Sequence, residues 1–122
     1  ARTDLDELLR VAGALAGVLA SIEPAPLLLA SSDMSHYVEE DEARRLDGEA
    51  LRAIASLDPA AVWTTVRQRR ISMCGVAACV VVMETLRRMG RLRRCQQLGY
   101  TTSAAASGDR QHVVGYAGVL FG

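Results

Sequence analysis

Apolar residues recur every three or four positions over several long segments of the chain, which is the spacing of one buried face of an α-helix. The first such segment runs from Thr3 to Ile22, and acidic residues occupy its first turn, where the helix dipole favours them. Further segments with the same spacing predict helices over residues 39–57, 59–69 and 76–89.

Several helix boundaries are marked by residues with strong local preferences. Pro24 stops the first helix because its ring blocks helical continuation. Asp58 is a good cap residue, and Pro59 then occupies the first helical position, where proline is favoured. Gly90 is placed to end the last predicted helix, since glycine readily adopts the left-handed backbone found there.

Other apolar segments predict strands. Leu27 to Ala30 contain no polar residue, as expected for an interior strand that is covered on both faces. Residues 91–102 and 112–121 predict two further strands around a loop rich in Ser, Ala, Gly and Asp. Gly115 and Gly118 in the last strand indicate a close backbone approach or a bulge.

The order helix, strand, three helices, strand, strand predicts an α/β fold in layers of sheet and helix. Three strands are too few to cover this much helix, and the predicted three-layer arrangement is therefore incomplete. The chain also begins at a helix and ends on a strand. We therefore expect residues 1–122 to form the carboxyl-terminal part of a single larger domain.

The balance of charged residues argues against some classes of binding partner. The chain has 14 basic residues, all arginine, and 14 acidic residues, so its formal net charge is zero. Such a chain lacks the long-range positive field of proteins that bind phosphate polymers or anionic lipid, and we expect neither nucleic acid nor a membrane as partner. The local basic patch over residues 87–94 is either a solvated helix end or a contact for an anion.

Cysteine usage bears on location. The chain has 3 cysteines, an odd number, and their spacing does not fit a disulfide framework. No segment resembles a signal peptide or a membrane-spanning apolar run of about 18 residues. We therefore expect a soluble, cytoplasmic protein.

Titratable residues crowd the end of the apolar run, in the sequence SSDMSHY at 31–37. Ligands of open α/β sheets bind beyond the carboxyl ends of strands, where Asp33 and His36 would lie. One interpretation is a capped turn that leads into the next helix. The other is catalytic, because a carboxylate beside a histidine orients the ring and raises its basicity, as a general acid/base requires.

Cys74 is the cysteine best placed for chemistry. It precedes a predicted helix start, where backbone N–H groups and the helix dipole stabilise a thiolate. Cys79 would lie roughly 140° further round the same helix, so these two do not form a chelating pair, and Cys79 and Cys95 are interpreted as packing residues. His112 is interpreted as a surface or turn residue, so a metal site would need ligands from outside the chain.

Several short blocks, in order, resemble the carboxyl-terminal half of the Memo family, whose bacterial and archaeal members are called AmmeMemoRadiSam system protein B. The blocks are ASSDMSHY (30–37), LDP (57–59), ISMCG (71–75), LGYTTS (98–103), GD (108–109) and VVGYAG (113–118). The Memo fold is similar to that of the LigB-type class III extradiol dioxygenases, which are non-haem iron enzymes. The resemblance thus implies an α/β domain about twice this length.

The resemblance also implies roles for individual residues. Cys74 matches the cysteine that supplies a metal ligand in Memo-like proteins, where the dioxygenases use a glutamate. Asp33 would lie at or beside the metal, and His36 would take the place of the dioxygenase acid/base. The remaining ligands, two histidines, belong to the amino-terminal half. Such a thiolate-containing site would suit iron or copper.

Two functions of different classes follow from these observations. The first is a metal-dependent redox or oxygenase-like protein, with Cys74 and Asp33 at the metal, His36 as acid/base and an unassigned substrate. The second is a non-catalytic protein that binds a peptide or small anion in the same cleft. In either case the expected partners are a small molecule or peptide and, to complete the sheet, the missing amino-terminal half or a second copy of the chain.

Overall fold

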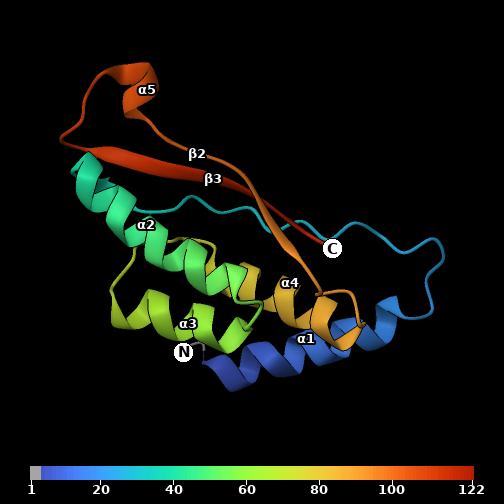
Figure 1. Cartoon of the computed structure of the whole chain (residues 1–122). Helices are drawn as coiled ribbons and strands as arrows, with labels where there is room; N and C mark the ends of the chain where they lie inside the picture. Colours follow the sequence, from blue (N-terminus) through green and yellow to red (C-terminus); the bar gives the residue numbers. More distant parts are fainter. Residues whose placement is uncertain (1–3) are drawn as a thin grey trace.

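The chain has a mixed α/β fold, which a computed structural model describes over residues 4–122 (Figure 1). Its elements are α1 (Leu5–Leu19), β1 (His36–Val38), α2 (Glu40–Ala55), α3 (Pro59–Gln68), α4 (Val76–Arg88), β2 (Cys95–Thr102), α5 (Ala104–Ser107) and β3 (Val113–Phe121). The predicted fold class is confirmed. None of the helices in the described part of the chain is long and apolar enough to cross a membrane.

Local sequence signals determine the helices. Asp4 caps α1 by accepting a hydrogen bond of 2.8 Å from the backbone N–H of Glu7, while the predicted start at Thr3 lies outside the described residues. Asp58 caps α3 in the same way, with Pro59 in its first turn. Gly90 follows α4 with a φ of 71°, a left-handed conformation that glycine adopts without strain. All four long helices are confirmed, although α1 ends three residues earlier than Ile22.

The strands form one antiparallel sheet in the order β1-β3-β2. Figure 1 shows β2 and β3 as a long twisted ribbon that ends at α5, with α2 lying alongside it and α1, α3 and α4 further away. Helix α2 packs against the strands and against α3, while α4 packs between α3 and α1. The buried core between these layers comprises Leu8, Met34, Ala50, Ile54, Val62, Val66, Ile71, Met73, Cys79, Val80 and Met83.

The prediction of an interior strand at Leu27 to Ala30 is wrong. These residues belong to no strand, and the side chains of Leu27 and Leu29 are 87% and 84% exposed. A strand requires a hydrogen-bonded neighbour, and no backbone group in residues 4–122 pairs with this segment. The actual strand, β1, lies further along the chain, so Asp33 and His36 sit at its amino end rather than beyond a carboxyl end.

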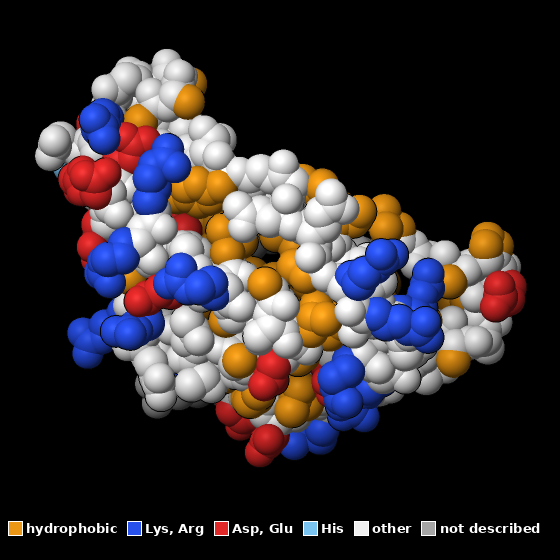
Figure 2. All heavy atoms as spheres, in the orientation of Figure 1, with side chains coloured by type: hydrophobic (Ala, Val, Ile, Leu, Met, Phe, Trp, Pro, Cys, Tyr) orange, Lys and Arg blue, Asp and Glu red, His pale blue; other side chains and the backbone are white. Residues whose placement is uncertain are grey.

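Glu84 is a buried acid near the end of α4, where it anchors two arginines of the basic patch. Its carboxylate accepts hydrogen bonds from Arg87 Nη2 at 2.8 Å and from Arg88 Nε at 3.1 Å. The bond from Arg87 is the main reason why the pKa of Glu84 lies below its usual value. Basic side chains gather on the surface here and again over α2 (Figure 2).

Glu84→Gln is expected to lower the free energy of unfolding at pH 7 by about 1 kcal/mol, because hydrogen bonds to a charged group are lost. A depressed folded-state pKa stabilises the native state above the usual value of 4.5, and this contribution disappears as pH falls through the folded-state pKa. Urea unfolding at pH 7 and at acidic pH should therefore show that the free energies of unfolding of Glu84→Gln and of the unmodified chain become equal as the pH falls. The exposed Glu23→Gln is the control, and a variant deficit independent of pH would contradict the prediction.

Candidate metal centre

Three predicted site residues converge at one point on the surface. Asp33, His36 and Cys74 each offer a ligand atom, and these atoms all lie within 4.8 Å of one another. Donor atoms around one transition-metal ion are closer together, roughly 3 to 4 Å apart, because each bond is about 2.0–2.3 Å long. Only a small inward movement would therefore bring all three donors onto a single ion.

The Cys74 sulfur contacts two polar groups of the opposite segment. The backbone N–H of Asp33 donates to Cys74 Sγ across 3.4 Å, and Ser32 Oγ lies 3.8 Å from the same sulfur. The backbone N–H of Gly75 donates to Ser32 Oγ at 2.8 Å, which ties the two segments together from the other direction. The Asp33 amide is thus a donor aimed at the sulfur, whereas the Ser32 hydroxyl donates to the backbone oxygen of Asp33 at 2.7 Å.

The ring of His36 is oriented by the loop that carries Cys74. Its Nδ1 lies 2.5 Å from the backbone carbonyl oxygen of Ser72, which can only accept, so Nδ1 carries a proton and donates. The other nitrogen, Nε2, lies 3.5 Å from Asp33 Oδ2. The contact with Ser72 thus orients the ring so that its second nitrogen faces the carboxylate of Asp33.

Each wall of the site is anchored in the core by a buried methionine. Met34 follows Asp33 and is 4% exposed, while Met73 precedes Cys74 and is 6% exposed. Both belong to the main apolar cluster. The methionines are turned into the core, whereas the adjacent Asp33 is about half exposed and the adjacent Cys74 is exposed.

Close contact between the two walls requires glycine at position 75. A Cβ added to Gly75 would lie 2.5 Å from Ser32 Cβ and 2.6 Å from the backbone oxygen of Ser31. Both atoms are fixed by the backbone, so neither can move aside as the end of a long side chain could. Gly75 therefore allows the close approach that brings Cys74 to Asp33.

Asp47, on α2, is a buried support that the sequence analysis missed. Asp47 Oδ1 accepts two hydrogen bonds from Ser35, from the backbone N–H at 2.9 Å and from the hydroxyl at 2.6 Å. Asp47 Oδ2 accepts a third from the Tyr100 hydroxyl at 2.5 Å. A Cβ at Gly115 would lie 2.0 Å from Oδ2, so the predicted close backbone approach at this glycine is confirmed. The available signal was an aspartate in line with the apolar positions Ala43 and Ala50 of the helix.

Outside this cluster, the other cysteines and the second histidine take the positions expected of them. Cys79 lies in the core, and burial raises the pKa of its thiol to about 11, so it stays protonated. Cys95 is half-buried in β2, and burial raises its pKa as well. The exposed His112 lies 3.8 Å from Asp109 in the loop before β3. The helix-cap interpretation of Asp33 is wrong, because Glu39 caps α2.

Comparison with protein families gives a match over almost the whole chain. A family model described as Memo-like protein matches residues 2–120. The chain is also similar to named proteins: it is 32% identical to a MEMO1 family protein of Methanopyrus kandleri, over 97% of this chain and 41% of the relative. It is 38% identical to a MEMO1 family protein of Archaeoglobus fulgidus, over 78% of this chain and 35% of that relative. The chain thus spans less than half the length of these relatives.

Gly75→Ala is expected to destabilise the protein by about 1–3 kcal/mol, because the new methyl group must push Ser32 and its backbone away from Cys74. The amide of Asp33 would then lose its hydrogen bond to the sulfur and exchange with solvent faster in NMR measurements. Gly17→Ala is the matched control, since its Cβ meets open space on α1. Unchanged stability and unchanged exchange at Asp33 would contradict the close-approach argument.

Asp47→Ala is expected to lower the free energy of unfolding by about 3 kcal/mol or more, because it leaves Ser35 and Tyr100 without their buried partner. Chemical denaturation measures this loss. Asp41→Ala, in the exposed first turn of the same helix, should cost less than about 1 kcal/mol. Equal losses for the two variants would show that Asp47 has no special structural role.

Proposed function

Because the chain belongs to the Memo-like protein family, we propose that it supplies part of a metal centre. In this proposal Cys74 is a thiolate ligand, Asp33 is a ligand or lies directly beside the ion, and His36 is the acid/base. The supporting observation is that the donor atoms of Asp33, His36 and Cys74 all lie within 4.8 Å of one another, on one exposed point of the surface.

The donor set fits iron or copper. Sulfur, nitrogen and oxygen donors together form a softer set than the two-histidine one-carboxylate arrangement of non-haem iron oxygenases, and they suit iron or copper. When bound, such an ion would supply redox chemistry or oxygen activation of the kind found in related dioxygenases. His36 contributes a different capacity, because its Nε2 can take or release a proton while Ser72 holds the ring in place.

Additional ligands would come from polypeptide beyond this chain. Asp33, His36 and Cys74 supply at most three donors, whereas a closed site for such an ion needs four or more. The relatives are more than twice as long as this chain, so the rest of their length offers a source of histidines. The exposed Leu27 and Leu29 lie on the segment that carries Asp33, where added polypeptide, or a second copy of the chain, would bury them.

The substrate in this proposal is a small molecule or peptide that approaches the exposed side of the cluster, where Asp33 and Cys74 reach solvent. We place the protein in the cytoplasm because its three cysteines are free, as expected in a reducing compartment.

Cys74→Ser tests the ligand assignment. The chain would be titrated anaerobically with Fe(II) and with Cu(I), with binding followed by calorimetry and by the sulfur X-ray absorption edge. Loss of a thiolate ligand should weaken binding by at least about tenfold, since outer contacts alone change affinity by 10–100-fold.

Cys95→Ser is the matched control, because it removes a half-buried thiol that lies outside the cluster. It should leave metal affinity unchanged. Equal affinity of Cys74→Ser and the unmodified chain, or equal losses in both variants, would overturn the assignment of Cys74 as a ligand. An anion rather than a metal bound beside His36 would favour the alternative function, a protein that binds a peptide or small anion.

A further inference from the structure

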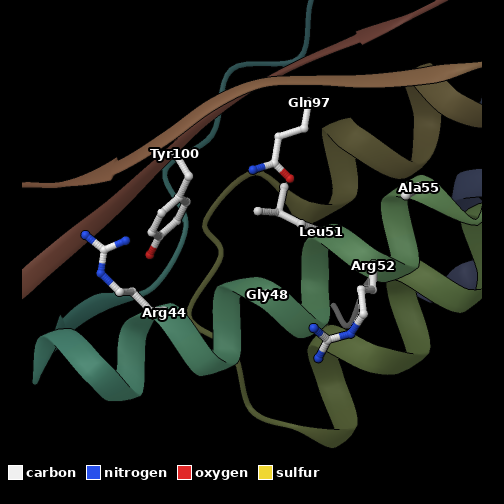
Figure 3. A pocket seen from close by; sticks show the side chains of 7 residues that line it. All are labelled: Arg44, Gly48, Leu51, Arg52, Ala55, Gln97 and Tyr100. Carbon is white, nitrogen blue, oxygen red and sulfur yellow. The ribbon is translucent and has the colours of Figure 1, made fainter.

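A cavity lies between α2 and the strand β2, on residues that the proposed metal centre does not use. It has a volume of about 370 Å³, within the range of small-ligand sites. We call it the α2–β2 pocket; its lining residues are Arg44, Gly48, Leu51, Arg52, Ala55, Gln97 and Tyr100 (Figure 3). The surface is hollowed between α2 and the ribbon, with apolar side chains at the bottom (Figure 2).

A β-bulge builds the strand wall of this pocket. Residues three apart on a regular strand point to opposite faces, so Gln97 and Tyr100 should diverge. The pairing shifts between Gln97 and Gly99, however, so that Gln97 pairs with Val119 and Tyr100 with Ala117. Val119 and Ala117 both face the helices, and their partners therefore do too. Figure 3 shows both β2 side chains directed toward α2. Bulges commonly re-aim side chains in this way beside binding sites.

The helix wall combines two cations with an apolar floor. Arg44 and Arg52 lie on the same stripe of α2 as Leu51, and the guanidinium of Arg52 folds back to within 3.5 Å of the Cβ position of Gly48. Arg44 donates one hydrogen bond to Glu40 at 3.2 Å and lies 5.3 Å from the centre of the Tyr100 ring. Its remaining N–H groups, and those of Arg52, have no hydrogen-bond partner within residues 4–122.

The lining residues of this pocket include no acidic side chain. Tyr100 remains uncharged at neutral pH, because burial and its hydrogen bond to Asp47 raise its pKa well above the usual value. Two carboxylates lie behind the lining: Asp47 accepts from the Tyr100 hydroxyl at 2.5 Å, and Glu40 pairs with Arg44 as well as with Arg110 and Thr102. Arg52 is therefore the arginine of the lining that no carboxylate within residues 4–122 pairs with.

We propose that the α2–β2 pocket binds a small organic acid with a flat apolar body. Arg52 would hold the carboxylate, whose planar geometry matches the guanidinium fork, while Arg44 lies at the other end of the pocket beside Tyr100 (Figure 3). The body would lie on Leu51 and against the Tyr100 ring, where Gly48 adds no side chain to the floor. The Gln97 carboxamide supplies a further donor and acceptor at the rim. This site is independent of the proposed metal centre.

Benzoate is the probe for this site, with benzamide as its neutral counterpart and inorganic phosphate as an anion without an apolar body. Each would be titrated into the chain at millimolar concentration while NMR follows the side-chain signals of Gln97, Tyr100 and the arginines. Benzoate should shift these signals in a saturable way. Benzamide, which lacks the carboxylate, and phosphate, which lacks the apolar ring, should each bind at least about tenfold more weakly.

Arg52→Gln is the decisive variant because Arg52 has no ion-pair partner in the described residues, and its loss should leave the fold intact. It should weaken benzoate binding about tenfold or more. Arg45→Gln is the matched control on the outer side of α2, where Arg45 pairs with Glu42 at 2.6 Å. Cys74→Ser should bind benzoate normally, which separates this site from the metal centre.

Three results would overturn the proposal. The first is the absence of saturable shifts with benzoate. The second is equal binding of benzoate and phosphate, which would reduce the site to a surface cation patch. The third is an equal loss of affinity in Arg52→Gln and Arg45→Gln, with both variants shown to be folded by their backbone NMR spectra.

Discussion

The buried carboxylate of Asp47 is the interaction on which the arrangement of both sites depends. One oxygen holds the backbone and hydroxyl of Ser35, and the other holds the hydroxyl of Tyr100, so α2 is bound at once to the β1 segment and to β2. The carboxylate is fully buried, and its satisfied hydrogen bonds offset the desolvation that burial costs. Gly115 completes the arrangement, because any larger residue at this position would place its Cβ on Asp47 Oδ2.

This constraint fixes one wall of the candidate metal centre. Ser35 lies between Asp33 and His36 in sequence, so its three polar contacts with α2 and with β3 set the course of the backbone that carries them. The opposite wall depends on different contacts, from the ring of His36 to Ser72 and from Ser32 to Gly75. The site is thus assembled from loops, but each loop is tied to a packed element, as is usual for functional residues.

The sequence predicted the four long helices and the last two strands, β2 and β3, but it misplaced the first strand, for a physical reason. Helices are specified by local spacing and caps, as at Asp58, whereas a strand exists only where a neighbour pairs with it. The apolar run Leu27 to Ala30 satisfies the local pattern and finds no partner among the described residues, while β1 forms at polar residues because β3 lies beside them. The juxtaposition of Asp33 and Cys74 was implied by family resemblance alone, since a contact across 41 positions has no local signal.

Burial and exposure are divided between adjacent residues of the candidate metal centre, which decides how its variants can be interpreted. Met34 and Met73 carry the packing, whereas Asp33 is about half exposed and Cys74 reaches solvent. Replacing a methionine would leave a cavity and cost about 2–5 kcal/mol, a large part of the stability of a small domain. Replacing Cys74 removes little buried area, so a change in binding on its substitution reports on the chemistry of the sulfur rather than on loss of the fold.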